Sequence, residues 1–269
     1  MKRLDFHLHT TASDGRLEPE ALVFKAAAHD LDAVAITDHD TTAGVAAAVA
    51  EGEALGVRVL TGVELSVDLR LDDETLSLHL ICLGFDLDDA PLQALLARTR
   101  AARGRAARET LERLSLAGYA AGIPARLLET VDRTVCRPHL ADALVAAGHA
   151  RDRQHAFQRF LAGEAYRTPY ELPTAEDAIR VVHEAGGLVV WAHPHEEELD
   201  RAAPALADLG LDGLEAFRAS RRAARSLYVE EVARHYGLLT GGGSDAHGGL
   251  IGQFVLTDEQ AGGLVRELS

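Results

Sequence analysis

Short apolar runs alternate with helix-forming stretches along most of this 269-residue chain. Eight runs rich in Val, Ile and Leu are typical of β-strands, at residues 4–9, 33–37, 57–60, 76–83, 188–192, 213–216, 238–240 and 254–256. Between most of them lie helical patterns, at residues 19–28, 42–55, 175–185, 196–209 and 221–235. This alternation predicts an α/β fold with a mostly parallel sheet. Because no G-x-G-x-x-G follows the first run, a barrel is favoured over a dinucleotide-binding fold.

The alternation stops between about residues 88 and 166, where only helical patterns remain. Glycines and prolines separate four expected helices, at residues 91–117, 124–130, 138–147 and 153–162. We therefore expect a barrel formed by residues 1–90 and 167–269, and a small all-helical insertion, residues 91–166, over the strand C-terminal ends. From Arg98 to Arg167 the chain has 13 arginines and 7 acidic residues, although its overall net charge is −15. A basic unit in an acidic protein is suited to face an anionic ligand.

Composition limits the partners and the compartment. A net charge of −15 argues against wrapping duplex DNA. The arginines that open the insertion lack interleaved aromatic residues for base stacking, so we expect them on a solvated face (Arg98, Arg100, Arg103, Arg105 and Arg108). No apolar run reaches the roughly 18 residues of a membrane span, and no signal-peptide pattern precedes the first strand. The two cysteines, Cys82 and Cys136, are expected as small buried apolar residues of a cytoplasmic protein.

Histidines and carboxylates stand at or near the ends of the apolar runs. His7 and His9 are two residues apart, so on a strand their side chains project to the same side and can share one ion. Asp245 and His247 repeat this spacing after a glycine-rich turn that lets the backbone approach the site. The other residues of this set are His39, Glu64, His79 and His193. Because α/β folds bind ligands beyond the carboxyl ends of parallel strands, these side chains are predicted to converge on a polynuclear metal site.

Taken one at a time, these residues have ordinary explanations. A histidine in the middle of a strand, such as His79, is usually a buried structural residue, and a loop carboxylate such as Glu64 is usually a solvated charge. Chance placement of the whole set at strand ends is the poorer explanation. A centre bridged by a carbamylated lysine is disfavoured because the only lysines, Lys2 and Lys25, lie at no strand end. Glu64 is then the available bridge, and mixed imidazole and carboxylate ligands favour Mn²⁺, Fe²⁺ or Zn²⁺.

The combined motifs resemble those of the PHP (polymerase and histidinol phosphatase) phosphoesterases from the first strand to the last turn. These motifs are His7-x-His9, Asp14, Thr37-Asp38-His39, Glu64, His79, Ala192-His193-Pro194 and Ser244-Asp245-x-His247. The resemblance implies a distorted seven-stranded (β/α)7 barrel with two or three divalent ions, of which Mn²⁺ is favoured. It implies three sets of ligands, namely His7, His9, Glu64 and Asp245 for the first ion, Glu64, His79 and His193 for the second, and Asp14, His39 and His247 for the third.

The insertion supports a narrower resemblance. Cys136-Arg137-Pro138-His139 looks like a motif of the branch that hydrolyses nucleoside 3′,5′-bisphosphates, some members of which trim short RNA from the 5′ end. The resemblance implies that Arg137 binds and stabilises the phosphoryl group, since a guanidinium offers phosphate two donors. His139 would donate to a phosphate or protonate the leaving group. The alternatives are a solvated Arg137 and a packed His139. His195 would contact the substrate, and Asp38 would orient a metal ligand.

These expectations describe a metal-dependent phosphatase that removes the 3′-phosphate of a nucleoside 3′,5′-bisphosphate. A metal-bridging hydroxide would be the nucleophile. Three alternatives stay open, namely a 5′–3′ exoribonuclease on short RNA with the same centre, a metal-holding interaction module without catalysis, and a histidinol-phosphate phosphatase. The complete ligand set weighs against the interaction module, and the helical insertion weighs against the histidinol-phosphate phosphatase.

Overall fold

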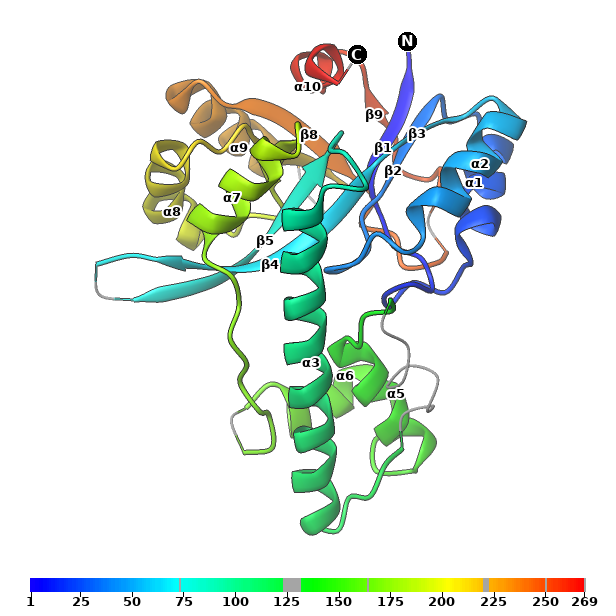
Figure 1. Cartoon of the computed structure of the whole chain (residues 1–269), viewed down its shortest axis with the longest axis vertical. Coiled ribbons are helices and arrows are strands. Elements are labelled where there is room, and N and C mark those ends of the chain that lie inside the picture. Colours follow the sequence, from blue (N-terminus) through cyan, green and yellow to red (C-terminus); the bar gives the residue numbers. More distant parts are fainter. Residues whose placement is uncertain (73, 123–131, 164, 220–222, 250, 269) are drawn as a thin grey trace.

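The computed structural model describes residues 1–72, 74–122, 132–163, 165–219, 223–249 and 251–268. Within these residues the strands form a four-stranded sheet of order β3-β2-β1-β9 and a five-stranded sheet of order β4-β5-β6-β7-β8 (Figure 1). The two sheets meet through isolated bridges, between His39 and Glu64 and between Leu8 and Ala246. The predicted α/β barrel is thus built from two sheets that share an interior, not from one continuous ladder.

The four-stranded sheet contains β1 (Arg3–Leu8), β2 (Ala33–Ile36), β3 (Arg58–Leu60) and β9 (Leu256–Thr257). The first three strands run parallel, and β9 pairs antiparallel with β1. The connecting helices are α1 (Pro19–Ala28) and α2 (Val45–Leu55). Their apolar residues pack against those of β1 and β2 in one core cluster, so β2 is buried along its whole length. This half follows the predicted βα alternation.

The five-stranded sheet contains β4 (Gly62–Arg70), β5 (Thr75–Leu83), β6 (Leu188–Trp191), β7 (Gly213–Arg218) and β8 (Leu239–Gly243). It packs against three helices, α7 (Ala175–Glu184), α8 (Glu196–Asp208) and α9 (Ala223–Tyr236). The C-terminal helix α10 (Gly262–Glu267) packs against interior residues of both sheets. Figure 1 places α10 at the end of the barrel opposite the insertion.

One strand is absent from the sequence-based prediction. β4 pairs antiparallel with β5 from Gly62–Leu83 to Arg70–Thr75, and β5 is also antiparallel to β6. This sheet is therefore mixed, where the apolar runs predicted a mostly parallel arrangement. The sequence does contain the two-residue period of a strand here, since the apolar residues at every second position from Val63 to Leu69 are buried. The polar residues Glu64 and Ser66 between them are buried as well, since this face of β4 forms part of the site.

The insertion contains α3 (Ala90–Leu116), α5 (Arg137–Ala146), the single-turn helix α6 (Arg153–Ala156) and a π-helical turn η1 (Phe157–Leu161). The helix expected at residues 124–130 lies outside the described residues. Figure 1 shows α3 running from the barrel into the insertion. Its N-terminal Leu92 and Leu96 belong to the core of the five-stranded sheet, whereas Leu114 belongs to a separate core with Leu144 and Phe160. The division at residues 90 and 167 stays a prediction, because α3 belongs to both parts.

Two further expectations concern cysteines and membranes. Cys82 and Cys136 are free and buried, as predicted. Among the described helices, none combines the length and the apolar character that crossing a bilayer requires.

Candidate metal centre and substrate pocket

Nine predicted ligands come from both sheets and from the loops that follow their strands. They are His7 in β1, His9 and Asp14 after β1, His39 after β2, Glu64 in β4, His79 in β5, His193 after β6, and Asp245 and His247 after β8. The structure brings all nine side chains together. Because the donors come from separate strands, the sheets fix their relative positions before any ion binds.

Glu64 lies at the middle of this cluster and is 1% exposed. Its Oε1 lies 2.8 Å from His79 Nδ1 and 2.9 Å from His193 Nε2. Its Oε2 lies 3.1 Å from His39 Nδ1. Burial alone would raise the pKa of Glu64, but the neighbouring imidazoles outweigh burial and hold the pKa well below its usual range. Glu64 is therefore an ionised carboxylate with each oxygen facing a different group of imidazoles, the arrangement a bridging ligand needs.

A second set of donors faces Glu64 Oε2 from the other sheet. His7 Nε2 and His9 Nε2 lie 3.4 and 3.3 Å from that oxygen, and 3.4 and 3.3 Å from Asp245 Oδ1. The approach of the strands is close, since a Cβ on Gly243 would come within 2.3 Å of His7 Cβ. The glycines of residues 241–243 thus continue strand β8 beside β1 instead of forming the predicted turn.

The third set contains His9, Asp14, His39 and His247, whose donor atoms lie within 4.8 Å of one another. The shortest contact in it joins His247 Nε2 to Asp14 Oδ1, at 3.2 Å. Burial opposes the charge on His247, but the hydrogen bond and the negative charge of Asp14 raise its pKa to about 9. His9 belongs to this set as well as to the set around Asp245. The sequence-based prediction assigned His9 to the first ion alone.

The donors fit divalent ions. Two donors of one ion at about 2.1 Å stand roughly 3.0–3.4 Å apart in octahedral or tetrahedral geometry, close to the spacings within this cluster. Among the described residues, the buried atoms without a hydrogen-bond partner include His7 Nε2, His9 Nε2, His39 Nδ1 and Glu64 Oε2. Buried polar atoms are rarely left without a partner, so these four atoms are suited to bind a cation. Their mixed nitrogen and oxygen chemistry suits Mn²⁺, Fe²⁺ or Zn²⁺.

Behind the donors lies a pair that the sequence analysis missed, Glu215 and Arg218 on β7. Glu215 is buried, and it accepts hydrogen bonds from His7 Nδ1 at 2.8 Å and from the backbone N–H of His193 at 2.6 Å. Arg218 donates to Asp245 and lies 3.4 Å from Glu215. A carboxylate that accepts from the second ring nitrogen fixes the tautomer of a ligating histidine. The available signal was a glutamate inside the apolar run of residues 213–216.

Asp38 supports the loop that carries Asp14. It is fully buried, and it accepts hydrogen bonds from the Thr10 backbone N–H at 2.7 Å and the Thr10 hydroxyl at 2.6 Å, together with one from Ser13 Oγ. Burial raises its pKa, and His9 and these hydrogen bonds counteract that shift. Its predicted role in orienting a metal ligand is compatible with this position and stays a prediction.

Backbone strain is concentrated beside the ligands. His193, Asp245 and Asp40 have positive φ angles of 37°, 54° and 52°, which non-glycine residues rarely adopt. Such conformations persist only where the surrounding structure enforces them, and they cluster at functional sites. Here they turn the chain at the strand ends so that the donors face inward.

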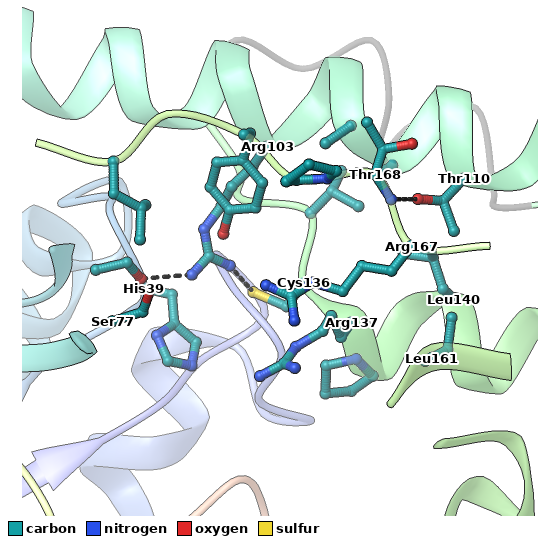
Figure 2. Close-up of a pocket in the computed structure, with 18 of the residues that line it drawn as sticks. His39, Ser77, Arg103, Thr110, Cys136, Arg137, Leu140, Leu161, Arg167 and Thr168 are labelled. Atoms are coloured by element: carbon teal, nitrogen blue, oxygen red, sulfur yellow. Dashed lines mark hydrogen bonds between the residues drawn. The ribbon is translucent and has the colours of Figure 1, made fainter. Parts of the chain in front are cut away.

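A cavity of about 460 Å³ opens between the metal ligands and the insertion, a size that suits a small ligand. Asp14, His39 and His79 form part of one wall, and Arg137 and Arg167 line the other side. Figure 2 shows His39, Arg103, Cys136, Arg137 and Arg167 around this space. An apolar portion is formed by insertion residues that include Val135, Leu140, Phe157 and Leu161.

Arg137 and Arg167 are cations without a carboxylate partner among the residues that the structure describes. Burial lowers the pKa of Arg137, and the positive charge of Arg167 lowers it further. Two guanidiniums that repel each other at the edge of a cavity are stabilised by an anion between or beside them. Arg167 was not predicted, because a single arginine after the insertion has no distinguishing pattern.

The other two predicted substrate contacts lie elsewhere. His139 does not line the cavity, and its Nδ1 accepts a hydrogen bond from the Cys136 backbone N–H at 3.0 Å as part of the cap of α5. Its predicted role as a proton donor gains no support from this position. His195 is exposed and precedes α8, outside the residues that line the cavity. Both roles stay predictions.

The first insertion helix departs from the expected solvated face. Arg103 is 9% exposed, and its Nε lies 2.7 Å from the buried carboxylate of Asp40. Arg100 Nη1 donates to the Asp40 backbone carbonyl at 2.9 Å. These two arginines face the barrel, whereas Arg98 and Arg105 are exposed. Positions along a helix cannot reveal which face will meet another part of the chain, so the prediction was wrong for Arg100 and Arg103.

Comparison with known proteins agrees with this geometry. The sequence matches the PHP domain family over residues 5–133. It is 35% identical over 249 residues to the phosphoribosyl 1,2-cyclic phosphate 1,2-diphosphodiesterase of Eggerthella lenta, covering 91% of this chain and 94% of that protein. It is 35% identical over 254 residues to the 5′-3′ exoribonuclease Rnm of Salmonella typhimurium, covering 90% and 84%. It is 33% identical over 204 residues to the 3′,5′-nucleoside bisphosphate phosphatase of Chromobacterium violaceum, covering 75% and 70%.

A solved structure extends the likeness to the fold. The putative metal-dependent phosphoesterase of Bifidobacterium adolescentis superposes with a TM-score of 0.83 at 33% identity, covering 98% of this chain and 96% of the other. The chain belongs to the PHP family and is a metal-dependent phosphoesterase.

Proposed function

We propose that this protein removes the 3′-phosphate of nucleoside 3′,5′-bisphosphates. The supporting observation is that one cavity offers two separate places for an anion. One is the cluster around Glu64, which suits divalent ions, and the other is the guanidinium pair Arg137 and Arg167. A substrate with two phosphate groups can occupy both places at once, with its base towards the apolar portion of the cavity. Similarity to the bisphosphate phosphatase of Chromobacterium violaceum also supports this substrate.

The nine clustered side chains would hold two or three divalent ions, with Mn²⁺ favoured by the mixture of imidazole and carboxylate. Such ions neutralise charge on a phosphoryl group and lower the pKa of water. The chain supplies the remaining functions. Glu215 accepts a hydrogen bond from His7 Nδ1–H, which would keep Nε2 free to bind an ion. The two arginines orient the substrate by fixing its second phosphate.

A phosphate-release assay tests this assignment. Protein purified with Mn²⁺ is given adenosine 3′,5′-bisphosphate, and ³¹P NMR identifies the product. We expect inorganic phosphate and adenosine 5′-monophosphate in equal amounts. Turnover no greater than that of Mn²⁺ alone, or release of the 5′-phosphate, would end the assignment.

A second candidate is 5′–3′ exonuclease activity on short RNA. A groove of about 640 Å³ shares Thr168, Pro169 and Tyr170 with the cavity and is also lined by the exposed Arg98 and Arg105. These arginines could bind the phosphates of a longer strand. The similarity to the Salmonella typhimurium exoribonuclease supports this activity. A 5′-phosphorylated RNA pentamer distinguishes the two, because faster hydrolysis of the pentamer than of the mononucleotide would favour the exonuclease. If the protein hydrolysed phosphoribosyl 1,2-cyclic phosphate but neither the bisphosphate nor the RNA pentamer, both proposed activities would be excluded.

A further inference from the structure

Arg103 is held by contacts with three segments of the chain. Its Nε faces the Asp40 carboxylate at 2.7 Å, its Nη2 donates to Ser66 Oγ at 2.6 Å, and its Nη1 donates to Cys136 Sγ at 3.4 Å. Figure 2 shows this guanidinium between the barrel and the insertion. Burial would lower the pKa of Arg103, but Asp40 outweighs burial and raises it, so the side chain stays charged. Three of the five N–H groups of this guanidinium thus face other groups of the protein.

The residues that Arg103 contacts lie next to residues of the metal centre or the substrate pocket. Asp40 directly follows His39, and its Oδ1 also accepts from the Ser66 backbone N–H at 2.8 Å. Ser66 lies two residues from Glu64 on β4, so the two side chains project to the same face of the sheet. Arg103 thus contacts the immediate neighbours of two metal donors on the barrel side.

On the other side, Arg103 contacts the segments that carry the two cavity arginines. Cys136 immediately precedes Arg137 at the start of α5. The Arg103 guanidinium carbon lies 5.9 Å from the ring centre of Tyr170, in the segment that begins with Arg167. One buried side chain therefore touches both halves of the proposed substrate site.

The chemistry of the contacts requires arginine. Asp40, Ser66 and Cys136 are reached by three different nitrogens of one planar group, an arrangement that a lysine ammonium cannot reproduce. A buried ion pair that serves stability alone can often be replaced by apolar residues. It does not need donors directed at three separate segments of the chain. The arrangement is suited to fixing the distance between two surfaces.

We propose that Arg103 is a positioning residue that sets the distance between the metal centre and the Arg137–Arg167 pair, and thereby the preference for substrates with two phosphate groups. This inference rests on the proposed function. Arg103 acts through Asp40, Ser66 and Cys136, and its removal lets the insertion shift relative to the barrel. Only a substrate that spans both anion sites is sensitive to that shift.

Steady-state kinetics of four variants test the inference, with adenosine 3′,5′-bisphosphate and adenosine 3′-monophosphate as substrates. The 3′-monophosphate retains the reacting phosphate and lacks the second one. We expect Arg103→Met to raise KM for the bisphosphate on the order of 10–100-fold, because small misplacements cost that much. Its kcat/KM for the monophosphate should stay within about threefold of the wild type. Arg103→Lys should fall between Arg103→Met and the wild type.

The other two variants separate positioning from folding. Ser66→Ala removes one contact of Arg103 without deleting a buried charge, and it should raise KM for the bisphosphate by about threefold to tenfold. Arg113→Met alters an exposed arginine of the same helix that lines neither the cavity nor the groove, and it should match the wild type. Thermal unfolding and Mn²⁺ content are measured for each variant. If Arg103→Met fails to fold, Ser66→Ala and Arg103→Lys decide.

Two failures can be told apart. If the Arg103 and Ser66 variants lose activity equally on both substrates, or change neither KM, the positioning role is wrong while the proposed function stands. If the wild type hydrolyses p-nitrophenyl phosphate but neither adenosine substrate, the proposed function is wrong, and the preference assigned to Arg103 falls with it.

Discussion

The two walls of the cavity are built in different ways. On the barrel side, every metal donor lies in a strand or in the loop that follows one, and neighbouring groups such as Glu215 fix the donors further. On the insertion side, Arg137 lies at the start of a helix and Arg167 lies in a segment outside the helices and strands. No carboxylate of the described chain pairs with either arginine. This difference suits a division of roles in which the strands of the barrel wall hold the ions and, under the proposed function, the insertion selects the phosphoester.

Loss of the Glu64 carboxylate should reduce activity more than any other change and should disturb only the metal centre on the barrel wall. In Glu64→Gln, the neutral amide cannot bridge two cations, so we expect kcat/KM to fall by at least about 10³-fold. Elemental analysis should show fewer Mn²⁺ ions per chain, and the exposed Glu53→Gln should behave as wild type. Full metal content and activity in Glu64→Gln would break the comparison.

Loss of a cavity arginine should affect binding of the substrate and leave the metals in place. We expect Arg137→Met to reduce kcat/KM for adenosine 3′,5′-bisphosphate by about 10–100-fold, the cost of losing hydrogen bonds to a charged group that does not react. Mn²⁺ content should be unchanged, which distinguishes this variant from Glu64→Gln. The exposed Arg113→Met is the matched control. Loss of metal in Arg137→Met would show that the two walls are not independent.

Glu215 tests how much the barrel wall depends on groups behind the donors. Glu215→Gln replaces the acceptor for His7 Nδ1, so the Mn²⁺ dissociation constant should rise about 10–100-fold. Electron paramagnetic resonance of free Mn²⁺ measures it directly, with the exposed Glu231→Gln as control. An unchanged dissociation constant would mean that the strands alone hold the metal donors in place, without help from Glu215.

The third ion site should depend on pH. The pKa of His247 is raised to about 9, so its proton must leave before a cation binds there. The affinity of the weakest Mn²⁺ site should therefore rise about tenfold per pH unit between pH 7 and 9. Titrations at pH 7 and 8 measure this change, and His247→Gln should abolish it. A pH-independent third site would mean that Asp14 does not hold the proton on His247.

Much of this arrangement was predictable from the chain. The i, i+2 pair His7/His9 was predictable, because a strand projects side chains of that spacing to the same side. Asp245 and His247 follow strand β8, and Asp245 has a positive φ angle, so strand geometry does not explain how these two reach the site. Glu215 and Arg218 could not be assigned, since they act through hydrogen bonds to residues distant in sequence. The inward face of α3 was equally hidden, because only the packing of Arg103 against Asp40 distinguishes it from an exposed basic helix.

Asp5 offers the smallest test, on stability. Burial raises its pKa from 3.8 to about 6, although hydrogen bonds from Ser244 counteract the shift. The folded protein thus binds more protons than the unfolded chain between these values, so stability falls as pH rises through that window. Without metal, Asp5→Asn should stabilise the protein by about 2–3 kcal/mol at pH 7.5 and by little below pH about 4. Calorimetry measures this, with the exposed Asp88→Asn as control. An equal effect at both pH values would contradict it.

The central claim is that donors from separate strands meet around Glu64 to hold several divalent ions opposite two arginines. Anomalous diffraction at the manganese absorption edge, from crystals grown with Mn²⁺, tests it most directly. We predict at least two peaks at bonding distance from the Glu64 carboxylate, sharing the imidazoles of His7, His79 and His193 among them. No peak at Glu64, or manganese only on the outer surface, would contradict the account.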